Sequence, residues 1–160
     1  MRCSVHGSSG SPGMSDDRDA IIDRLSPILA RRADLDFVIL FGSAATGKLR
    51  PFSDVDVALH TPQPIEILDL GRLASDLEVA AGRAVDILEP RGLQSRNPAL
   101  AFAVLESGQP FLVRNEEALV QFRKSTFLSY MDTAPLRKRM NEALLDRIRR
   151  GTFGRSRNVG

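Results

Sequence analysis

Apolar residues in the first part of the chain follow two different periods, which predict a helix and then a strand. Within residues 16–32, apolar side chains recur every three or four positions from Ile21 to Leu29, as on one face of a helix. Pro27 would kink or split this helix. The unbroken apolar run 37–41, which stops at a glycine, is typical of a buried strand.

A second strand, a long helix and a third strand are predicted next. Apolar and polar residues alternate over 54–59, which is the period of a half-buried strand. Prolines at positions 62 and 64 open a helix that runs to Ala81 and ends at Gly82. The run 84–88 forms the third strand. The predicted buried stripe of the long helix consists of Ile67, Leu68, Leu70, Leu73 and Leu77.

The remainder of the chain is mostly helical in pattern. A loop over 90–97 leads to a helix over 98–107 and to a short strand over 110–113, at an edge of the sheet or crossing over it. We therefore predict an α/β (α+β) fold, with a small mixed sheet flanked by helices. Two C-terminal stripes follow, Leu119, Phe122 and Thr126, and then Leu136, Met140, Leu144 and Ile148. The last stripe either packs on its own domain or forms a dimer or partner surface.

Three aspartates stand where these strands can bring them together. Asp54 and Asp56 are two positions apart, so both point to one face of the second strand. Asp86 is the single charged residue within an apolar strand, where a lone carboxylate would be costly. If the two strands are neighbours, the carboxylates can share divalent cations, and Asp86 can also take a proton from an attacking hydroxyl. Oxygen ligands of this kind suit Mg²⁺.

Gly42 and Ser43 lie where the first strand gives way to a short helical turn. Glycine lets the backbone approach a phosphate closely, and the amides of such a turn point outward. The Ser43 hydroxyl offers one more hydrogen bond, and Lys48 and Arg50 can add positive charge. A Gly-Ser pair alone is usually only a turn, and such basic residues are more often solvated. The spacing to the aspartates favours a nucleotide site.

At this point the motifs show a family resemblance. The stretch Leu40–Gly47, continued by Ser53–Asp56, resembles the signature of the polymerase beta superfamily of nucleotidyltransferases. The short chain is similar to the minimal (MNT) branch, whose members often serve as antitoxins of HEPN ribonuclease toxins. The segment Tyr130–Arg137 resembles the C-terminal region of these proteins. The resemblance covers about residues 16–150.

The resemblance implies a polymerase-beta-like fold and a defined set of site residues. In this family the glycine–serine turn holds the triphosphate and three carboxylates bind two Mg²⁺ ions. That assigns nucleotide binding to Gly42 and Ser43. It assigns metal binding and catalysis to Asp54, Asp56 and Asp86.

The resemblance further implies transfer of AMP from ATP to a hydroxyl, a tyrosine, of a cognate HEPN toxin, with release of pyrophosphate. Two alternatives stay open, an antitoxin that inhibits by binding alone and a transferase that modifies a small molecule such as an antibiotic. The second would need an acidic pocket and usually a further domain. Many family members carry arginine where this chain has Thr46, which leaves triphosphate affinity and nucleotide choice open.

Length and composition fit one domain. The chain has 160 residues, 42% of them apolar, which is enough for a packed core. We expect a catalytic core over 16–114 and a helical segment of the same domain over 115–150. A disordered extension over 1–15 and a flexible tail over 151–160 complete the chain. The single Cys3 excludes an internal disulfide framework.

Charge and hydropathy indicate the cellular location and the kinds of partner to expect. The net charge is +2, yet residues 114–160 hold 11 basic and 5 acidic side chains. Few aromatic residues are interleaved with these charges, so direct binding of nucleic acid is not expected. No apolar segment is long enough for a transmembrane helix, and a reducing cytoplasm is the expected location. A protein partner, in a hetero-oligomer or a homo-oligomer, is expected instead.

Tyr130 and His60 could each have a catalytic role, but a structural role is favoured for both. Tyr130, the single tyrosine, is more often a packed ring than an acceptor for self-modification. His60, four residues after Asp56, is more often a strand-end residue than a base.

Overall fold

The computed structural model describes residues 14–151, and the expectations for residues 1–13 and 152–160 lie outside the described residues. The first helix, α1 (Met14–Ala30), begins two residues before the predicted start and ends two residues before the predicted end. Pro27 lies inside it, in the last turn, and the helix is not split.

Four strands form one mixed sheet in the order β3-β2-β1-β4. β1 pairs antiparallel with β2 and with β4, whereas β2 and β3 run parallel. The short last strand therefore lies at an edge, which is one of the two arrangements predicted for it. The strands are β1 (Phe37–Phe41), β2 (Val55–His60), β3 (Val85–Leu88) and β4 (Gln109–Val113).

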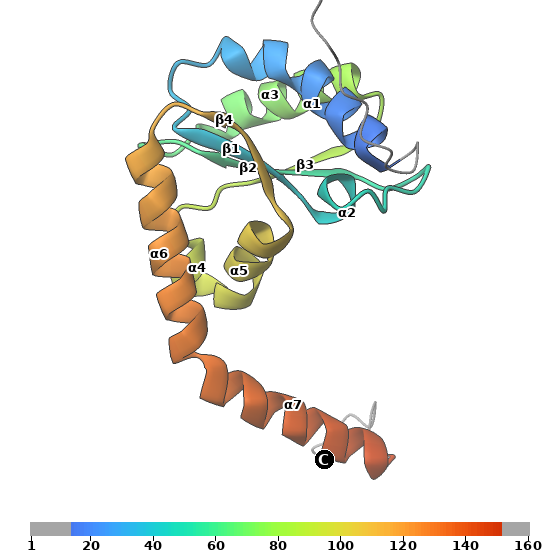
Figure 1. Cartoon of the computed structure of the whole chain (residues 1–160), viewed down its shortest axis with the longest axis vertical. Helices are drawn as coiled ribbons and strands as arrows, with labels where there is room; N and C mark the ends of the chain where they lie inside the picture. The colour runs from blue at the N-terminus through green and yellow to red at the C-terminus, as the bar shows by residue number, and fades with distance from the viewer. Residues whose placement is uncertain (1–13, 152–160) are drawn as a thin grey trace, which may run out of the picture.

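Helices cover both faces of the sheet (Figure 1). On one face, α1 and α3 (Ile67–Ala81) pack over Val57 and Leu59 of β2. On the other face, Ala58 packs with residues of α4 (Leu93–Arg96), α5 (Pro98–Ser107) and α6 (Glu116–Asp132). The alternation along β2 thus separates two apolar cores, and the fold class predicted from the sequence is confirmed.

Two local predictions are wrong. Ile67 and Leu68 were placed in the buried stripe of α3, but they are 83% and 74% exposed. Leu68 lies about opposite Leu77 on a helix of 3.6 residues per turn, and Ile67 is the first residue of the helix, ahead of the part that packs. The segment predicted as a loop over 90–97 contains the short helix α4. Gly82 ends α3 as predicted, in the left-handed conformation with φ +70°.

The two C-terminal helices differ in how they pack. Leu119, Phe122 and Thr126 of α6 are buried, as the first stripe predicts. In contrast, α7 (Ala134–Arg149) contains no buried residue, so its stripe does not pack on its own domain. Figure 1 shows α7 extending away from the sheet and its helices. No helix within residues 14–151 combines the length and apolar character that crossing a membrane requires.

Candidate active site

Gly42 joins the end of β1 to the short helix α2 (Gly42–Ala45) in a conformation that requires glycine. Its φ is +69°, in the left-handed region that other residues rarely adopt. A Cβ at this position would lie 2.4 Å from Oδ2 of Asp56. The predicted turn therefore brings the backbone directly against one of the predicted carboxylates.

Hydrogen bonds across short turns stabilise the segment that follows Gly42. The Thr46 hydroxyl donates to the Gly42 carbonyl at 3.2 Å, and the Lys48 amide donates to the Ser43 carbonyl at 3.0 Å. Thr46, the residue that departs from the common family pattern, thus tightens the turn. Ser43 is half-buried, whereas the Lys48 side chain is exposed. Both predicted residues therefore lie at the turn that follows β1.

The strand pairing sets two aspartates side by side. Asp56 is paired with Phe41 at the end of β1 and, across the parallel ladder, with Asp86 of β3. Neighbouring strands are about 4.8 Å apart, so paired side chains on one face are close. Asp54 lies immediately before β2 rather than within it and is exposed, as is Asp86. Gly42 thus lies against Asp56, with Asp86 on the neighbouring strand and Asp54 two residues before Asp56.

The electrostatics of this group favour a bound cation. Burial raises the pKa of Asp56, and the negative charges of Asp86 and Asp54 raise it further. Ionisation of Asp56 therefore costs free energy, both because the side chain is partly buried and because the neighbouring carboxylates repel its charge. A cation placed among the three carboxylates would offset that cost.

The donor set fits Mg²⁺. All three side chains offer carboxylate oxygens, and Mg²⁺ typically takes one or two such ligands together with waters and substrate phosphates. Within residues 14–151, no three His, Cys, Asp or Glu side chains are gathered tightly enough to form a metal site by themselves. An ion held here would therefore take part of its shell from water and from the nucleotide.

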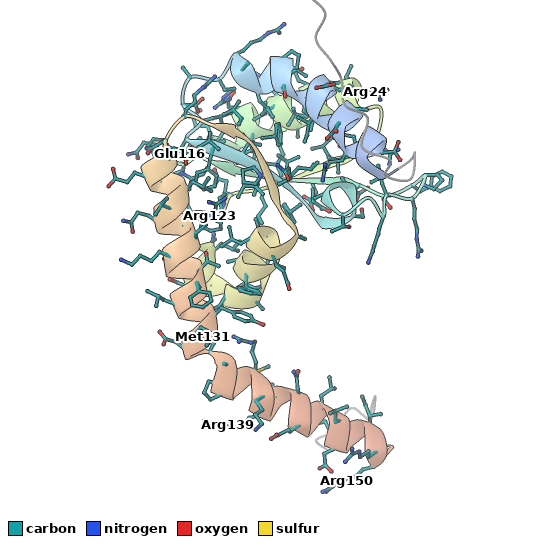
Figure 2. The ribbon with its side chains drawn as sticks, viewed as in Figure 1. Arg24, Glu116, Arg123, Met131, Arg139 and Arg150 are labelled. Atoms are coloured by element: carbon teal, nitrogen blue, oxygen red, sulfur yellow. The ribbon has the colours of Figure 1, made fainter. Side chains whose placement is uncertain are left out.

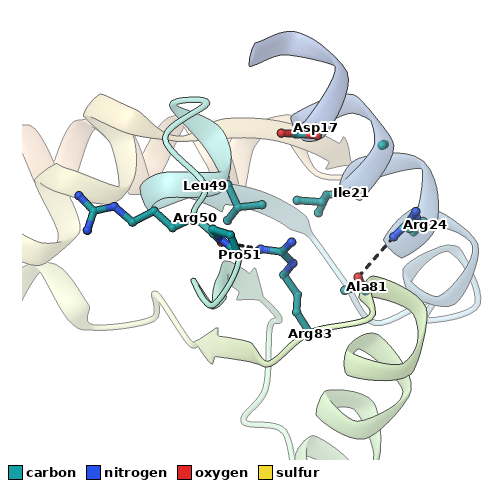
Figure 3. Close-up of a pocket in the computed structure, with 9 residues that line it drawn as sticks. Asp17, Ile21, Arg24, Leu49, Arg50, Pro51, Ala81 and Arg83 are labelled. Atoms are coloured by element: carbon teal, nitrogen blue, oxygen red, sulfur yellow. Dashed lines mark hydrogen bonds between the residues drawn. The ribbon is translucent and has the colours of Figure 1, made fainter. Parts of the chain in front are cut away.

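Arg83 is a residue that the sequence analysis missed. Its guanidinium donates to the carbonyls of Arg50 and Ser53, at 3.2 Å and 3.3 Å, and so ties the segment before Asp54 to the start of β3 (Figure 3). Behind this segment lies a cavity of about 370 Å³, lined by Asp17, Ala20, Ile21, Arg24, Leu49, Arg50, Pro51, Ala81 and Arg83. Arg50 is therefore a partner of Arg83 through its backbone carbonyl.

Ser107, at the end of α5, was also missed. The Gly42 amide donates to its hydroxyl at 3.5 Å, and that hydroxyl donates to the Ala103 carbonyl at 2.8 Å. The turn is thereby tied to a helix 65 positions away in the chain. No local sequence signal indicates this contact.

His60 and Tyr130, for which the sequence favoured structural roles, both make packing or polar contacts away from the turn. His60 lies at the far end of β2, where its Nδ1 is 2.9 Å from the Asp36 carboxylate. Tyr130 stacks on Phe102 with ring centroids 3.9 Å apart, and Arg137 lies 3.5 Å from the centre of its ring. Both observations agree with the packing roles favoured by the sequence.

Comparison with known proteins identifies the family. The sequence profile described as "Polymerase beta, Nucleotidyltransferase" matches residues 23–117. This match covers more than half of the chain and includes the glycine turn and all three aspartates. The chain therefore belongs to the polymerase beta nucleotidyltransferase family. No curated protein sequence matches it.

Solved structures share the fold over a longer stretch. A toxin–antitoxin complex with AMP-PNP matches with TM-score 0.63 and 22% identity, over 81% of this chain and 98% of the other. An MNT antitoxin in complex with a tri-AMPylated HEPN toxin from Shewanella oneidensis matches with TM-score 0.62 and 19% identity, over 80% and 98%. A minimal nucleotidyltransferase matches with TM-score 0.51 and 33% identity, over 64% and 100%.

Proposed function

We propose that this chain is an Mg²⁺-dependent nucleotidyltransferase antitoxin. It transfers AMP from ATP to a tyrosine hydroxyl of a cognate HEPN ribonuclease toxin, and this modification silences the toxin. The observation that carries the proposal is the close approach of the Gly42 turn to Asp56, a carboxyl whose pKa is raised by burial and by the negative charges of Asp86 and Asp54. The likeness to MNT antitoxins in toxin complexes supports the partner.

The reaction needs placement more than covalent chemistry from the protein. The toxin hydroxyl oxygen bonds to the α-phosphorus of ATP, the bond from that phosphorus to the bridging oxygen breaks, and pyrophosphate leaves. The turn at Gly42 and Ser43 would hold the triphosphate with its amides and the serine hydroxyl. Positioning of this kind can supply several orders of magnitude in rate.

The three aspartates would bind the metal and accept the proton. Asp54, Asp56 and Asp86 would hold Mg²⁺, which when bound neutralises charge on the phosphates. Asp86 is the carboxylate that we assign to accept the proton of the attacking hydroxyl, since it is exposed on the edge strand β3, where an acceptor can approach. Lys48, exposed after the turn, would add positive charge near the leaving pyrophosphate.

Isotope labelling tests the reaction directly. With ATP labelled at the α-phosphate, the label should appear on the cognate HEPN toxin. With ATP labelled at the γ-phosphate it should leave in pyrophosphate. With the Asp54→Asn variant, the toxin should stay unlabelled and no labelled pyrophosphate should be released. Label from the γ-position on the toxin would indicate a kinase and contradict the proposal.

Inhibition by binding alone is the second candidate, because α7 offers an unpacked surface to a partner. Neutralisation of the toxin in cells separates the two. The catalytic proposal predicts that the Asp54→Asn, Asp56→Asn double variant no longer protects cells. Protection at the level of the unmodified chain would favour binding alone.

A further inference from the structure

Within residues 14–151, most of the large exposed apolar side chains belong to one segment, residues 127–150, which we call the arm. Eight of the thirteen large apolar side chains that are exposed among the described residues belong to it. They are Phe127, Leu128, Met131, Leu136, Met140, Leu144, Leu145 and Ile148. Solvent-exposed apolar residues scattered singly need no explanation, but a contiguous group on one element indicates an interaction site.

The apolar residues of α7 form a line along the helix. Met140, Leu144 and Ile148 are each four positions apart, which is the spacing of anchors that enter a groove on a partner. Figure 2 shows Arg139 and Arg150 on a helix that no other element covers.

The direction of the arm is fixed at the junction of α6 and α7. The ring of Tyr130 is held between Phe102 of α5 and the guanidinium of Arg137. Arg137 also donates to the Tyr130 carbonyl at 2.6 Å and to the Thr133 hydroxyl. A surface that is already held in place loses less conformational entropy when a partner binds it.

The arm lies beyond the catalytic part of the chain. The nucleotidyltransferase profile ends at Glu117, one residue after α6 begins. Two chains from toxin–antitoxin complexes match 81% and 80% of this protein, whereas residues 23–117 are 95 of its 160 residues. The shared fold therefore reaches past the segment that the profile describes.

Charge argues against a second copy of this chain as the occupant. Residues 127–150 carry six basic and three acidic side chains. Two arms packed against each other would bring like charges together around their apolar lines, which is unfavourable. A complementary surface would be an apolar groove bordered by acidic side chains.

We infer that the arm is the docking surface for the toxin. This inference rests on the proposed function, which requires a protein acceptor to be held while its hydroxyl reaches the Gly42 turn. The apolar line of α7 enters a groove on the HEPN protein, and the basic side chains meet its acidic rim. The arm thus supplies affinity for the acceptor, separately from the chemistry at the aspartates.

A pair of double variants of the full chain tests this role. Met140→Ser, Leu144→Ser removes two apolar side chains from the arm, and Ile67→Ser, Val79→Ser removes two from the exposed face of α3. All four side chains are exposed, so both variants should keep the fold. The arm variant should weaken the complex with the cognate HEPN toxin by about 100-fold, at about tenfold per buried anchor. The α3 variant should stay within twofold.

Kinetics with the same toxin separate docking from catalysis. The arm variant should raise KM for the toxin while kcat at saturating toxin stays unchanged. Toxin affinity within twofold of the unmodified chain would overturn the inference. It would also be overturned if the arm variant lost only self-association, or only binding to phosphatidylserine vesicles. If the unmodified chain binds the toxin but transfers nothing, the proposed function fails, while the affinity comparison still tests the arm.

Discussion

Replacing Gly42 with alanine tests whether the active site depends on the close approach of the turn to Asp56. The substitution has two costs. A left-handed backbone costs a residue with a Cβ about 1–2 kcal/mol. The new Cβ would also lie 2.4 Å from Oδ2 of Asp56, well inside an ordinary contact, so the carboxylate has to move by about 1 Å.

The predicted loss of activity follows from that displacement. A misplacement of about 1 Å in a positioned group can cost about 100-fold, or about 2.7 kcal/mol in the activation free energy. We therefore expect Gly42→Ala to lower kcat for AMP transfer by about two orders of magnitude. Its free energy of unfolding in urea should fall by about 1–2 kcal/mol from the backbone cost, or more if Asp56 resists the shift.

Gly82 offers a matched control. Its φ is +70°, against +69° for Gly42, but a Cβ at Gly82 would have no atom within 4 Å. Gly82→Ala should therefore cost about the same 1–2 kcal/mol of stability from the backbone and leave kcat unchanged. Normal kcat in Gly42→Ala, or an equal loss of kcat in both variants, would refute the reasoning that the turn positions Asp56.

Two further substitutions test the electrostatics and the support of the site. Asp56→Asn should abolish transfer yet raise the free energy of unfolding at neutral pH. Because the pKa of Asp56 is raised in the folded state, ionisation of this carboxyl opposes folding, and the gain in stability should shrink as the pH falls through the folded-state pKa. Urea unfolding at several pH values measures this gain. A variant that is less stable than the unmodified chain at neutral pH would contradict the reasoning. Arg83→Ala should lower kcat by about tenfold, because Asp54 would be held less firmly, and Arg83→Lys should recover part of this loss. Equal kcat in both variants and the unmodified chain would show that the hydrogen bonds to Arg50 and Ser53 are dispensable.

Local patterns in the sequence predicted the parts of the fold that local physics determines. The run 37–41, the alternation around Asp56 and the glycine at position 82 each have one favoured backbone structure. The pairing of Asp56 with Asp86 was a condition of the predicted cation site, and the parallel pairing of β2 with β3 meets it, although Asp86 is exposed there rather than buried.

Other features depend on contacts that the sequence pattern does not contain. Arg83 and Ser107 bond to residues 30 and 65 positions away, so no local period indicates them. The apolar character of Leu68 did not reveal that its side of α3 faces solvent. The stripe on α7 was visible, but its lack of an internal partner emerged only from the packing of the helices.

The most direct test of the central claim is the intact mass of the cognate HEPN toxin. It would be measured after incubation with the chain, Mg²⁺ and each nucleoside triphosphate in turn. We predict a gain of whole AMP units with ATP and no gain with the Asp54→Asn variant. An unchanged toxin mass, in a complex that forms and still neutralises the toxin, would contradict the account.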